Sequence, residues 1–218
     1  MTIPNEARDR VKGAFEPVAL ALGRLGLTPD ALTLIGFGIT VLGAIALGLQ
    51  RWTLGGVIIL LGGVFDMFDG TLARATGRVS RLGAFMDSVF DRFGESIVYV
   101  GIIVGAVLGE HTRVPILAAA AMAASFMVSY IRAKSEGLGF TPGGGMAAVG
   151  LMPREVRLVV LFAGLILTDA PDIKALELAL GIIAVGATLT SIQRILHVRQ
   201  QALSNDPAEG RTTGQEHS

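Results

Sequence analysis

Long apolar stretches alternate with short polar ones along most of the chain and predict six membrane-spanning helices. A helix needs about 20 predominantly apolar residues to cross the hydrocarbon core of a bilayer. The expected spans cover about 31–49, 53–68, 82–108, 114–130, 154–167 and 176–196. The third is longer than the bilayer requires, so we expect its first two turns to project into a polar cavity.

The segment that precedes the first span has a different pattern. Within residues 5–26, apolar side chains such as Val11 and Phe15 recur at helical spacing opposite arginines and lysines. This pattern is typical of an amphipathic helix that lies in the membrane interface. Thr28 is then expected to cap the next helix, with Pro29 at its first position.

The composition agrees with a membrane protein of one domain. Of the 218 residues, 51% are hydrophobic and only 17% are charged, and there is no cysteine, which excludes disulfides and thiol chemistry. We expect a single membrane domain over residues 1–203. The glycine-rich segment 137–152 is a candidate substrate loop, and the polar residues 204–218 are expected to form a disordered cytoplasmic tail.

Positive charges are distributed unevenly between the two ends of the expected spans. If both termini lie on the inner side, 15 of the 18 lysines and arginines lie there too, and only Arg51, Arg113 and Lys174 remain outside. Cytoplasmic segments of membrane proteins are enriched in these residues. The chain is therefore expected in the inner cell membrane, with both termini in the cytoplasm.

Four aspartates stand at the inner ends of the second and third expected spans. Asp66 and Asp69 are three residues apart, and Asp87 and Asp91 are four apart, so each pair shares one face of its helix. Carboxylates that converge at membrane depth are tolerable only if cations neutralise them. Oxygen ligands without histidine or cysteine favour Mg²⁺ or Mn²⁺ over Zn²⁺. Two such ions would suit displacement at phosphorus, because they can stabilise the attacking and leaving oxygens.

These acids belong to a longer pattern of small, acidic and basic residues. In order and spacing, the pattern comprises Asp66, Asp69, Gly70, Ala73, Arg74, Gly83, Asp87 and Asp91. It resembles the complete signature of the CDP-alcohol phosphotransferases, and the layout of apolar segments is similar to that family over roughly residues 10–200. The resemblance implies a six-helix membrane enzyme that transfers a phosphatidyl group from a CDP-linked lipid such as CDP-diacylglycerol to an alcohol and releases CMP.

The resemblance also assigns roles within the site. Asp66, Asp69 and Asp87 are the expected metal ligands, with Asp91 as a fourth ligand and as the general base that an alcohol nucleophile needs at neutral pH. The residues expected to bind the CDP-lipid are Thr28, Pro29, Thr33, Gly70, Ala73, Arg74 and Gly83. The alternatives are that both threonines serve only as helix cap and helix hydroxyl, and that Arg74 is only a headgroup-level charge.

Basic residues at the inner ends of the last three spans are candidates for binding the acceptor. They are Arg132, Lys134, Arg154, Arg157 and Arg194. Their spacing suits a cradle for an anionic alcohol, although the inner-side excess of positive charge also accounts for them. The run SYIRAKSEGLG and the arginines at 154, 157 and 194 resemble the phosphatidylinositol-phosphate synthases, whose acceptor is inositol phosphate. Pro153 and the glycine-rich segment depart from that pattern, so glycerol 3-phosphate is the alternative acceptor.

Two other classes of protein compete with the enzyme. Intramembrane acids also mark ion or proton pathways, but here they cluster at one end instead of following a path through the bilayer. A scaffold without activity would not need the complete signature. The resemblance implies a homodimer, and no nucleic-acid partner is expected.

Overall fold

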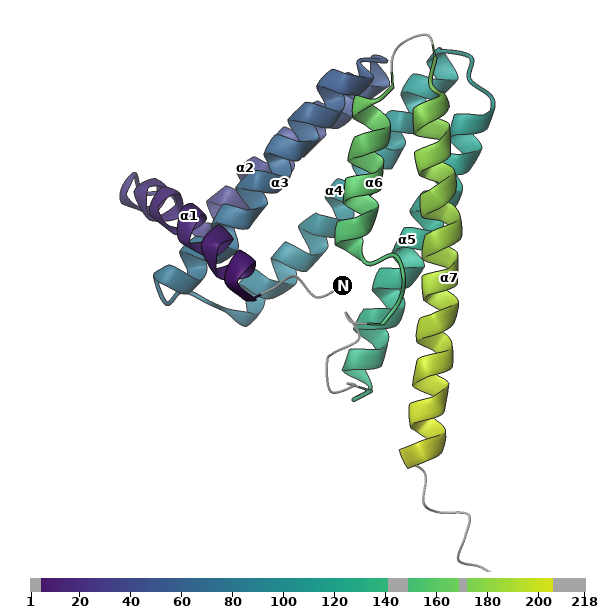
Figure 1. Cartoon of the computed structure of the whole chain (residues 1–218). Helices are drawn as coiled ribbons and strands as arrows, with labels where there is room; N and C mark the ends of the chain where they lie inside the picture. The colour runs from purple at the N-terminus through teal and green to yellow at the C-terminus, as the bar shows by residue number, and fades with distance from the viewer. Residues whose placement is uncertain (1–4, 141–148, 169–171, 206–218) are drawn as a thin grey trace, which may run out of the picture.

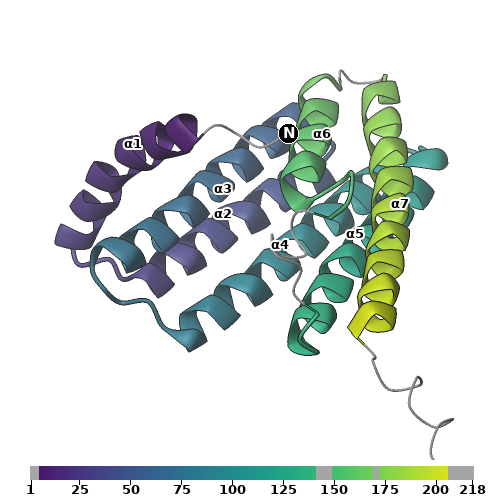
Figure 2. The same ribbon diagram turned by 60° about the horizontal axis from the view of Figure 1, so that its bottom comes forward.

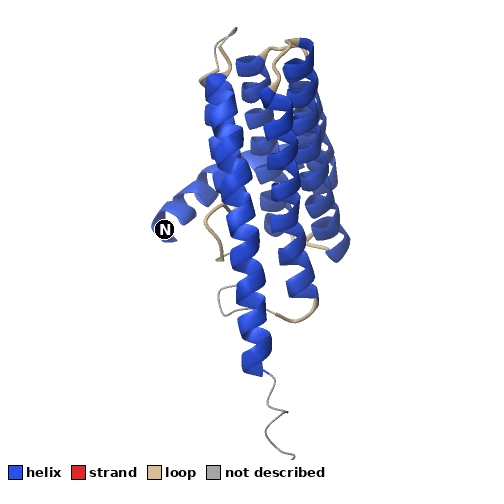
Figure 3. Cartoon of the chain, turned by 90° about the vertical axis from the view of Figure 1, so that its right-hand side faces the viewer, coloured by secondary structure: helices blue, strands red, loops and turns tan. Residues whose placement is uncertain are grey.

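A computed structural model of the chain describes residues 5–140, 149–168 and 172–205, and these contain helices and loops but no strand (Figure 3). The helices are α1 (Asn5–Arg24), α2 (Pro29–Gly48), α3 (Trp52–Ala75), α4 (Arg81–Leu108), α5 (Arg113–Gly137), α6 (Arg154–Ile166) and α7 (Lys174–Asn205), as labelled in Figure 1. The predicted all-α class is therefore confirmed.

Four of these helices, α2, α3, α5 and α7, are long and apolar enough to cross a membrane. Helix α4 has sufficient length, but its first half carries several charged side chains, including Asp87, Asp91 and Glu95. Helix α6 has 13 residues and extends over only about 20 Å, whereas the hydrocarbon core is about 30 Å thick. The chain is thus a polytopic helical membrane protein, and the count of six spans stays a prediction.

The helices form two groups that α4 connects. Helices α2 and α3 pack closely together, and α2 also lies against α4, while α5 and α6 pack against α7 (Figure 2). The two groups converge towards the turns 49–51 and 109–112 and diverge towards the opposite end (Figure 1). The diverging end holds the second half of α3 and the first turns of α4, where the sequence places the aspartates.

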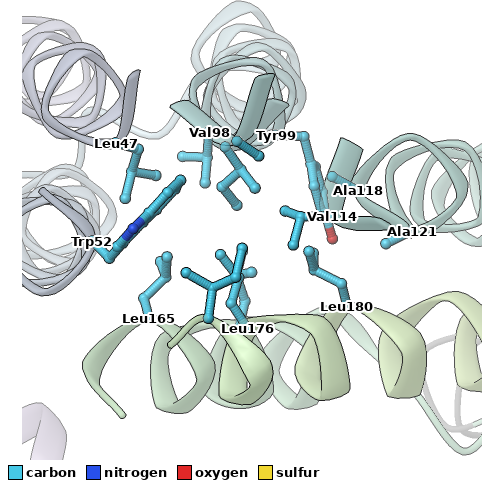
Figure 4. Packing of buried hydrophobic residues seen from close by; sticks show 14 of the residues in the cluster. Leu47, Trp52, Val98, Tyr99, Val114, Ala118, Ala121, Leu165, Leu176 and Leu180 are labelled. Atoms are coloured by element: carbon cyan, nitrogen blue, oxygen red, sulfur yellow. The ribbon is translucent and has the colours of Figure 1, made fainter. Parts of the chain in front are cut away.

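The buried apolar core lies at the converging end. Leu47, Trp52, Tyr99, Leu165 and Leu176 belong to one cluster, to which α2, α3, α4, α6 and α7 each contribute (Figure 4). Close packing of this kind is what stabilises helix association in lipid, where no hydrophobic driving force acts between spans. The converging end therefore holds the bundle together, and the diverging end is free to carry polar side chains.

Glycines bring α2 and α3 into backbone contact. A Cβ atom added to Gly36 would lie 3.1 Å from the carbonyl oxygen of Gly62, and one added to Gly43 would lie 3.1 Å from that of Gly55. Small residues at such crossings allow close approach of the helices. The approach places the first turns of α2 against the second half of α3, where Asp66 and Asp69 lie.

We predict that Gly62→Ala lowers the melting temperature of the protein in detergent. The new Cβ would meet the Thr40 hydroxyl at 2.6 Å and the Gly36 carbonyl oxygen at 3.0 Å, and the backbone atom cannot move without separating the helices. Overpacking of this kind costs about 1–3 kcal/mol. Gly63→Ala is the matched control, because nothing lies within 4 Å of its added Cβ. Equal melting temperatures for the two variants would contradict the close crossing.

Several predicted boundaries need correction. Helix α3 does not end near Phe68 but continues to Ala75, because residues 71–75 favour helix and Gly77, with φ +66°, provides the left-handed residue of a C-terminal cap. Arg74 is consequently helical, and the connection to α4 is shorter than expected. Helix α7 runs to Asn205, two residues into the predicted tail, whose remaining residues lie outside the described part.

The segment before the first span is helical, as predicted, but ends at Arg24. Phe15 packs against Phe68 of α3, with ring centroids 5.3 Å apart, and the same cluster contains Ala19, Leu22 and Leu72. Helix α1 is therefore docked on the second half of α3, and its position in the membrane interface stays a prediction. Most of the candidate substrate loop, residues 141–148, lies outside the described residues.

Candidate active site

Three of the four signature aspartates converge. Asp66 and Asp69 of α3 and Asp87 of α4 each offer a carboxylate oxygen, and these oxygens lie within 4.8 Å of one another. Oxygens that bind one Mg²⁺ lie about 3–4.2 Å apart, given its ligand distance of about 2.1 Å. Only a small contraction separates this arrangement, which we call the acidic trio, from metal-binding geometry.

The electrostatics of the acidic trio also suit a cation. Asp69 is buried and accepts a short hydrogen bond from the Thr33 hydroxyl of α2, while Asp66 and Asp87 are partly exposed. Among the described residues, no lysine or arginine forms an ion pair with any of the three. Arg154 acts on Asp66 and Asp87 only from beyond ion-pair distance. The three carboxylates repel one another at this spacing. Their all-oxygen donor set is the one that Mg²⁺ and Mn²⁺ prefer.

Local structure places the two aspartate-bearing helices. Ser80 caps α4 by accepting a hydrogen bond from the Gly83 amide at 2.9 Å, which fixes the start of the helix nearly two turns before Asp87. On α2, Thr28 accepts from the Ala31 amide at 3.2 Å, so the predicted N-cap is confirmed. The caps and the glycine crossing together set the positions of the acidic trio.

Asp91 occupies a different environment from the acidic trio. Its carboxylate accepts hydrogen bonds from both terminal nitrogens of Arg154 on α6, and Arg92 lies 3.6 Å away. Asp91 is still near enough to Asp66 and Asp87 to repel them. The fourth aspartate therefore stands beside the acidic trio but is neutralised by an arginine, an arrangement that the sequence does not predict.

A cavity of about 690 Å³ opens beside the acidic trio, between α1, α2, α3 and the start of α4. This volume is within the range of small-molecule sites. The cavity, which we call the head-group cavity, is lined by all seven residues expected to bind the CDP-lipid: Thr28, Pro29, Thr33, Gly70, Ala73, Arg74 and Gly83. Thr28 thus both caps a helix and faces the cavity. Sequence reasoning missed Asp30, Thr71, Arg78 and Ser80, which also line it.

A second cavity, of about 540 Å³, lies between α2, α3, α4 and α6. Its walls are mostly apolar and include Phe37, Ile59 and Phe162, so we call it the apolar cavity. Its charged residues include Asp66 and two ion pairs, Asp91 with Arg154 and Glu95 with Arg157. Both cavities are lined by Thr33 and Asp66, and the acidic trio therefore stands at their junction.

The five candidate acceptor residues do not form one solvent-facing cradle. Arg154 and Arg157 line the apolar cavity, but Arg157 is only 1% exposed and donates to Glu95 at 3.0 Å. Arg194 is also buried and donates to the carbonyl oxygens of Val128 and Val149. Among the described residues, Arg157 and Arg194 are therefore hydrogen-bonded to acceptors within the protein. Of the five candidates, Arg154 is the one that lies beside the aspartates.

The remaining two candidates are exposed and lie on α5. Arg132 pairs with Glu136 at 3.0 Å, and Lys134 lines neither of the two cavities. Arg194 is near enough to Arg132 and Arg157 to repel both, so basic groups from α5, α6 and α7 do gather on this side. Basic groups from three helices thus lie on this side together with acids such as Glu95 and Glu136, and Arg154 is the one bonded to a signature aspartate.

The geometry defines a helical membrane protein with an acidic centre at the junction of a polar and an apolar cavity. The family model of the CDP-alcohol phosphatidyltransferases matches residues 26–193, and the chain belongs to this family and is a transferase. The resemblance predicted from the signature is thereby confirmed.

Relatives with a name or a solved structure agree with this assignment. The chain is 33% identical over 197 residues to archaetidylinositol phosphate synthase of Pyrococcus horikoshii, which covers 90% of this chain and 97% of that protein. It is similar to the crystal structure of Mycobacterium tuberculosis phosphatidylinositol phosphate synthase with CDP-DAG bound, with a TM-score of 0.76, 30% identity, and coverage of 84% and 92% of the two chains. The same enzyme with manganese and citrate gives a TM-score of 0.75 at 28% identity, over 92% and 93%.

Proposed function

We propose that the protein transfers the phosphatidyl group of CDP-diacylglycerol to the hydroxyl of inositol phosphate and releases CMP. The observation that carries this proposal is the position of the acidic trio, which stands where the head-group cavity meets the apolar cavity. A donor with a nucleotide diphosphate at one end and acyl chains at the other needs such a junction at its reacting phosphorus. The relatives named for inositol phosphate products support the choice of acceptor.

The donor is proposed to bind with its cytidine and ribose in the head-group cavity, where Gly70 and Ala73 leave room beside α3. A Cβ at Gly70 would lie 3.3 Å from a terminal nitrogen of Arg74, so the glycine also keeps this guanidinium free to approach a phosphate. Asp66, Asp69 and Asp87 would hold the divalent ions. Two bound Mg²⁺ or Mn²⁺ ions would supply charge neutralisation at the pyrophosphate and at the departing CMP.

Asp91 is proposed as the general base. The acceptor hydroxyl oxygen attacks the lipid-side phosphorus, the bond from that phosphorus to the CMP oxygen breaks, and the hydroxyl proton passes to the Asp91 carboxylate. Arg154 holds this carboxylate with both terminal nitrogens and faces the same cavity, so it orients the base. A phosphate on the acceptor would be attracted to the same guanidinium and to the basic groups behind it.

The distribution of positive charge supports a cytoplasmic orientation for both termini and for the acidic trio, in the inner membrane. The CDP-linked donor would then reach the head-group cavity from the cytoplasmic leaflet. The homodimer that the family resemblance implies is part of this proposal.

An acceptor screen in proteoliposomes tests the proposed function. With CDP-diacylglycerol present, CMP release is measured for inositol phosphate, glycerol 3-phosphate, serine and inositol, each with Mg²⁺, with Mn²⁺ and with a chelator. We expect the fastest release with inositol phosphate and none without a divalent ion. Faster release with glycerol 3-phosphate would establish the alternative acceptor. Activity with uncharged alcohols alone would show that the basic residues only orient the chain in the membrane. Ion flux without CMP release would favour a transporter.

A further inference from the structure

Glu95 lies one turn beyond Asp91 on α4 and is the centre of a buried ion-pair network that the proposed mechanism does not use. It is 9% exposed and accepts hydrogen bonds from Arg157 of α6, from Nε at 3.3 Å and from Nη2 at 3.0 Å. Its second carboxylate oxygen lies 3.3 Å from Arg92 Nη1. One buried carboxylate therefore pairs with two guanidinium groups.

The arginines near the acidic trio form ion pairs with some of the neighbouring carboxylates and not with others. Seven carboxylates line the two cavities, namely Asp30, Asp66, Asp69, Asp87, Asp91, Glu95 and Glu155. Three guanidinium groups contact members of this set, namely Arg92, Arg154 and Arg157. Glu95 pairs with two of these arginines and Asp91 with Arg154, while Arg92 also lies 3.6 Å from Asp91. The acidic trio is thereby left without an arginine partner among the described residues.

Two parallel ion pairs also bridge α4 and α6. The backbones of these helices scarcely approach each other, and the apolar cavity lies between them. Asp91 and Glu95 are four residues apart on α4, Arg154 and Arg157 are three apart on α6, and each acid contacts one of these arginines. Helix α6 starts without a side-chain cap at Pro153. The Glu95–Arg157 pair therefore fixes the turn of α6 that carries Arg154.

We propose that Glu95 is a positioning residue for the transfer reaction. It keeps Arg157 away from the acidic trio, so that the trio stays open to divalent ions, and it holds α6 so that Arg154 meets Asp91. This role rests on the proposed function, in which the acidic trio holds the ions and Arg154 orients the base.

Removing the charge of Glu95 should raise the metal requirement. In Glu95→Gln, Arg157 would be a buried cation without a full counter-charge, a state that proteins avoid. Glu155, Asp66 and Asp91 line the same cavity as Arg157, and the last two are the acids at the site that would be available to it. An arginine that turns towards them competes with the divalent ion. We expect the half-saturating Mg²⁺ concentration to rise at least tenfold, and the KM for CDP-diacylglycerol at saturating Mg²⁺ to change less than twofold.

The experiment compares the wild type with Glu95→Gln and with the double variant Glu95→Gln/Arg157→Gln. CMP release is titrated with Mg²⁺, and Mn²⁺ binding is measured independently of activity by electron paramagnetic resonance. The double variant removes the competing cation together with its partner, and its half-saturating Mg²⁺ should return to within about threefold of the wild type. Asp172→Asn serves as the control, because it breaks an exposed pair with Lys174 at the opposite end of the molecule.

A melting temperature that falls in Glu95→Gln without any change in Mg²⁺ or Mn²⁺ half-saturation would show that the pair only stabilises the fold, and would overturn the proposal. If Glu95→Gln does not fold, Glu95→Asp provides the test: the shorter side chain cannot hold both arginines, and a rise of about threefold is expected, whereas no rise would overturn it. If the wild type binds Mn²⁺ but releases no CMP, the proposed function fails, and the Mn²⁺ titrations still decide the role of Glu95.

Discussion

Asp91→Asn is expected to abolish phosphatidyl transfer while CDP-diacylglycerol binding stays near the wild-type level. Asparagine fills the same space but cannot accept the proton of the acceptor hydroxyl, and general-base catalysis contributes about 10²–10⁴-fold. Asp91 is also outside the acidic trio, so its loss leaves Asp66, Asp69 and Asp87 in place to hold the ions. We therefore expect kcat to fall at least 100-fold.

The measurement pairs single-turnover CMP release with CDP-diacylglycerol binding at saturating Mg²⁺. Asp172→Asn makes the same chemical change at an exposed position far from both cavities and should retain wild-type values. Transfer by Asp91→Asn within about threefold of the wild type would remove Asp91 from the role of base.

Asp66→Asn is expected to weaken the binding of divalent ions as well as turnover, whereas Asp91→Asn is expected to lower turnover alone. Asp66 lines both cavities and belongs to the acidic trio, so replacing its charged oxygen lowers the affinity for the divalent ions. Loss of even an outer partner of a metal ligand costs about 10–100-fold in metal affinity, and loss of a ligand should cost at least as much. Binding of the CDP-lipid that depends on Mg²⁺ should therefore fall together with turnover.

Titration of CDP-diacylglycerol binding against Mg²⁺ distinguishes the two aspartates. For Asp66→Asn we expect the half-saturating Mg²⁺ concentration to rise at least tenfold. For Asp91→Asn we expect CDP-diacylglycerol binding to reach the wild-type level once Mg²⁺ is saturating, because the three members of the acidic trio remain. Wild-type binding at wild-type Mg²⁺ concentrations by Asp66→Asn would contradict the assignment of the acidic trio to the metal.

Features set by neighbours along the chain were predictable from the sequence. The Thr28 cap needs only residues 28–31, and the faces shared by Asp66 with Asp69 and by Asp87 with Asp91 follow from helical geometry. The end of α3 was misplaced because apolar character marks where a helix leaves the membrane, whereas helix propensity and Gly77 decide where it stops. Hydropathy therefore predicts the presence of a helix more reliably than the residue at which the helix ends.

Features set by contacts between distant segments were not predictable in the same way. The pairing of Asp91 with Arg154 joins residues 63 positions apart, and which acid meets which arginine depends on how α6 lies beside α4. Arg157 and Arg194 were expected to face an acceptor, but burial commits them to Glu95 and to backbone carbonyl oxygens. A signal for Glu95 did exist, because it repeats the four-residue spacing of Asp87 and Asp91 one turn further along.

The separation of core and site explains how the bundle tolerates so many charges. The large apolar cluster around Trp52 and Leu176 lies where the helices converge, and the acidic residues lie where they diverge (Figure 1). Ionisable groups at membrane depth are tolerated where they face a cavity or one another. Packing at one end thus provides the stability that the charged end does not.

Anomalous scattering from crystals grown with Mn²⁺ and a CDP-linked donor would locate the metal ions. We expect anomalous peaks about 2.2 Å from carboxylate oxygens of Asp66, Asp69 and Asp87, beside the donor pyrophosphate. A bound donor with no anomalous peak among these three side chains, under conditions in which the protein releases CMP, would contradict this expectation.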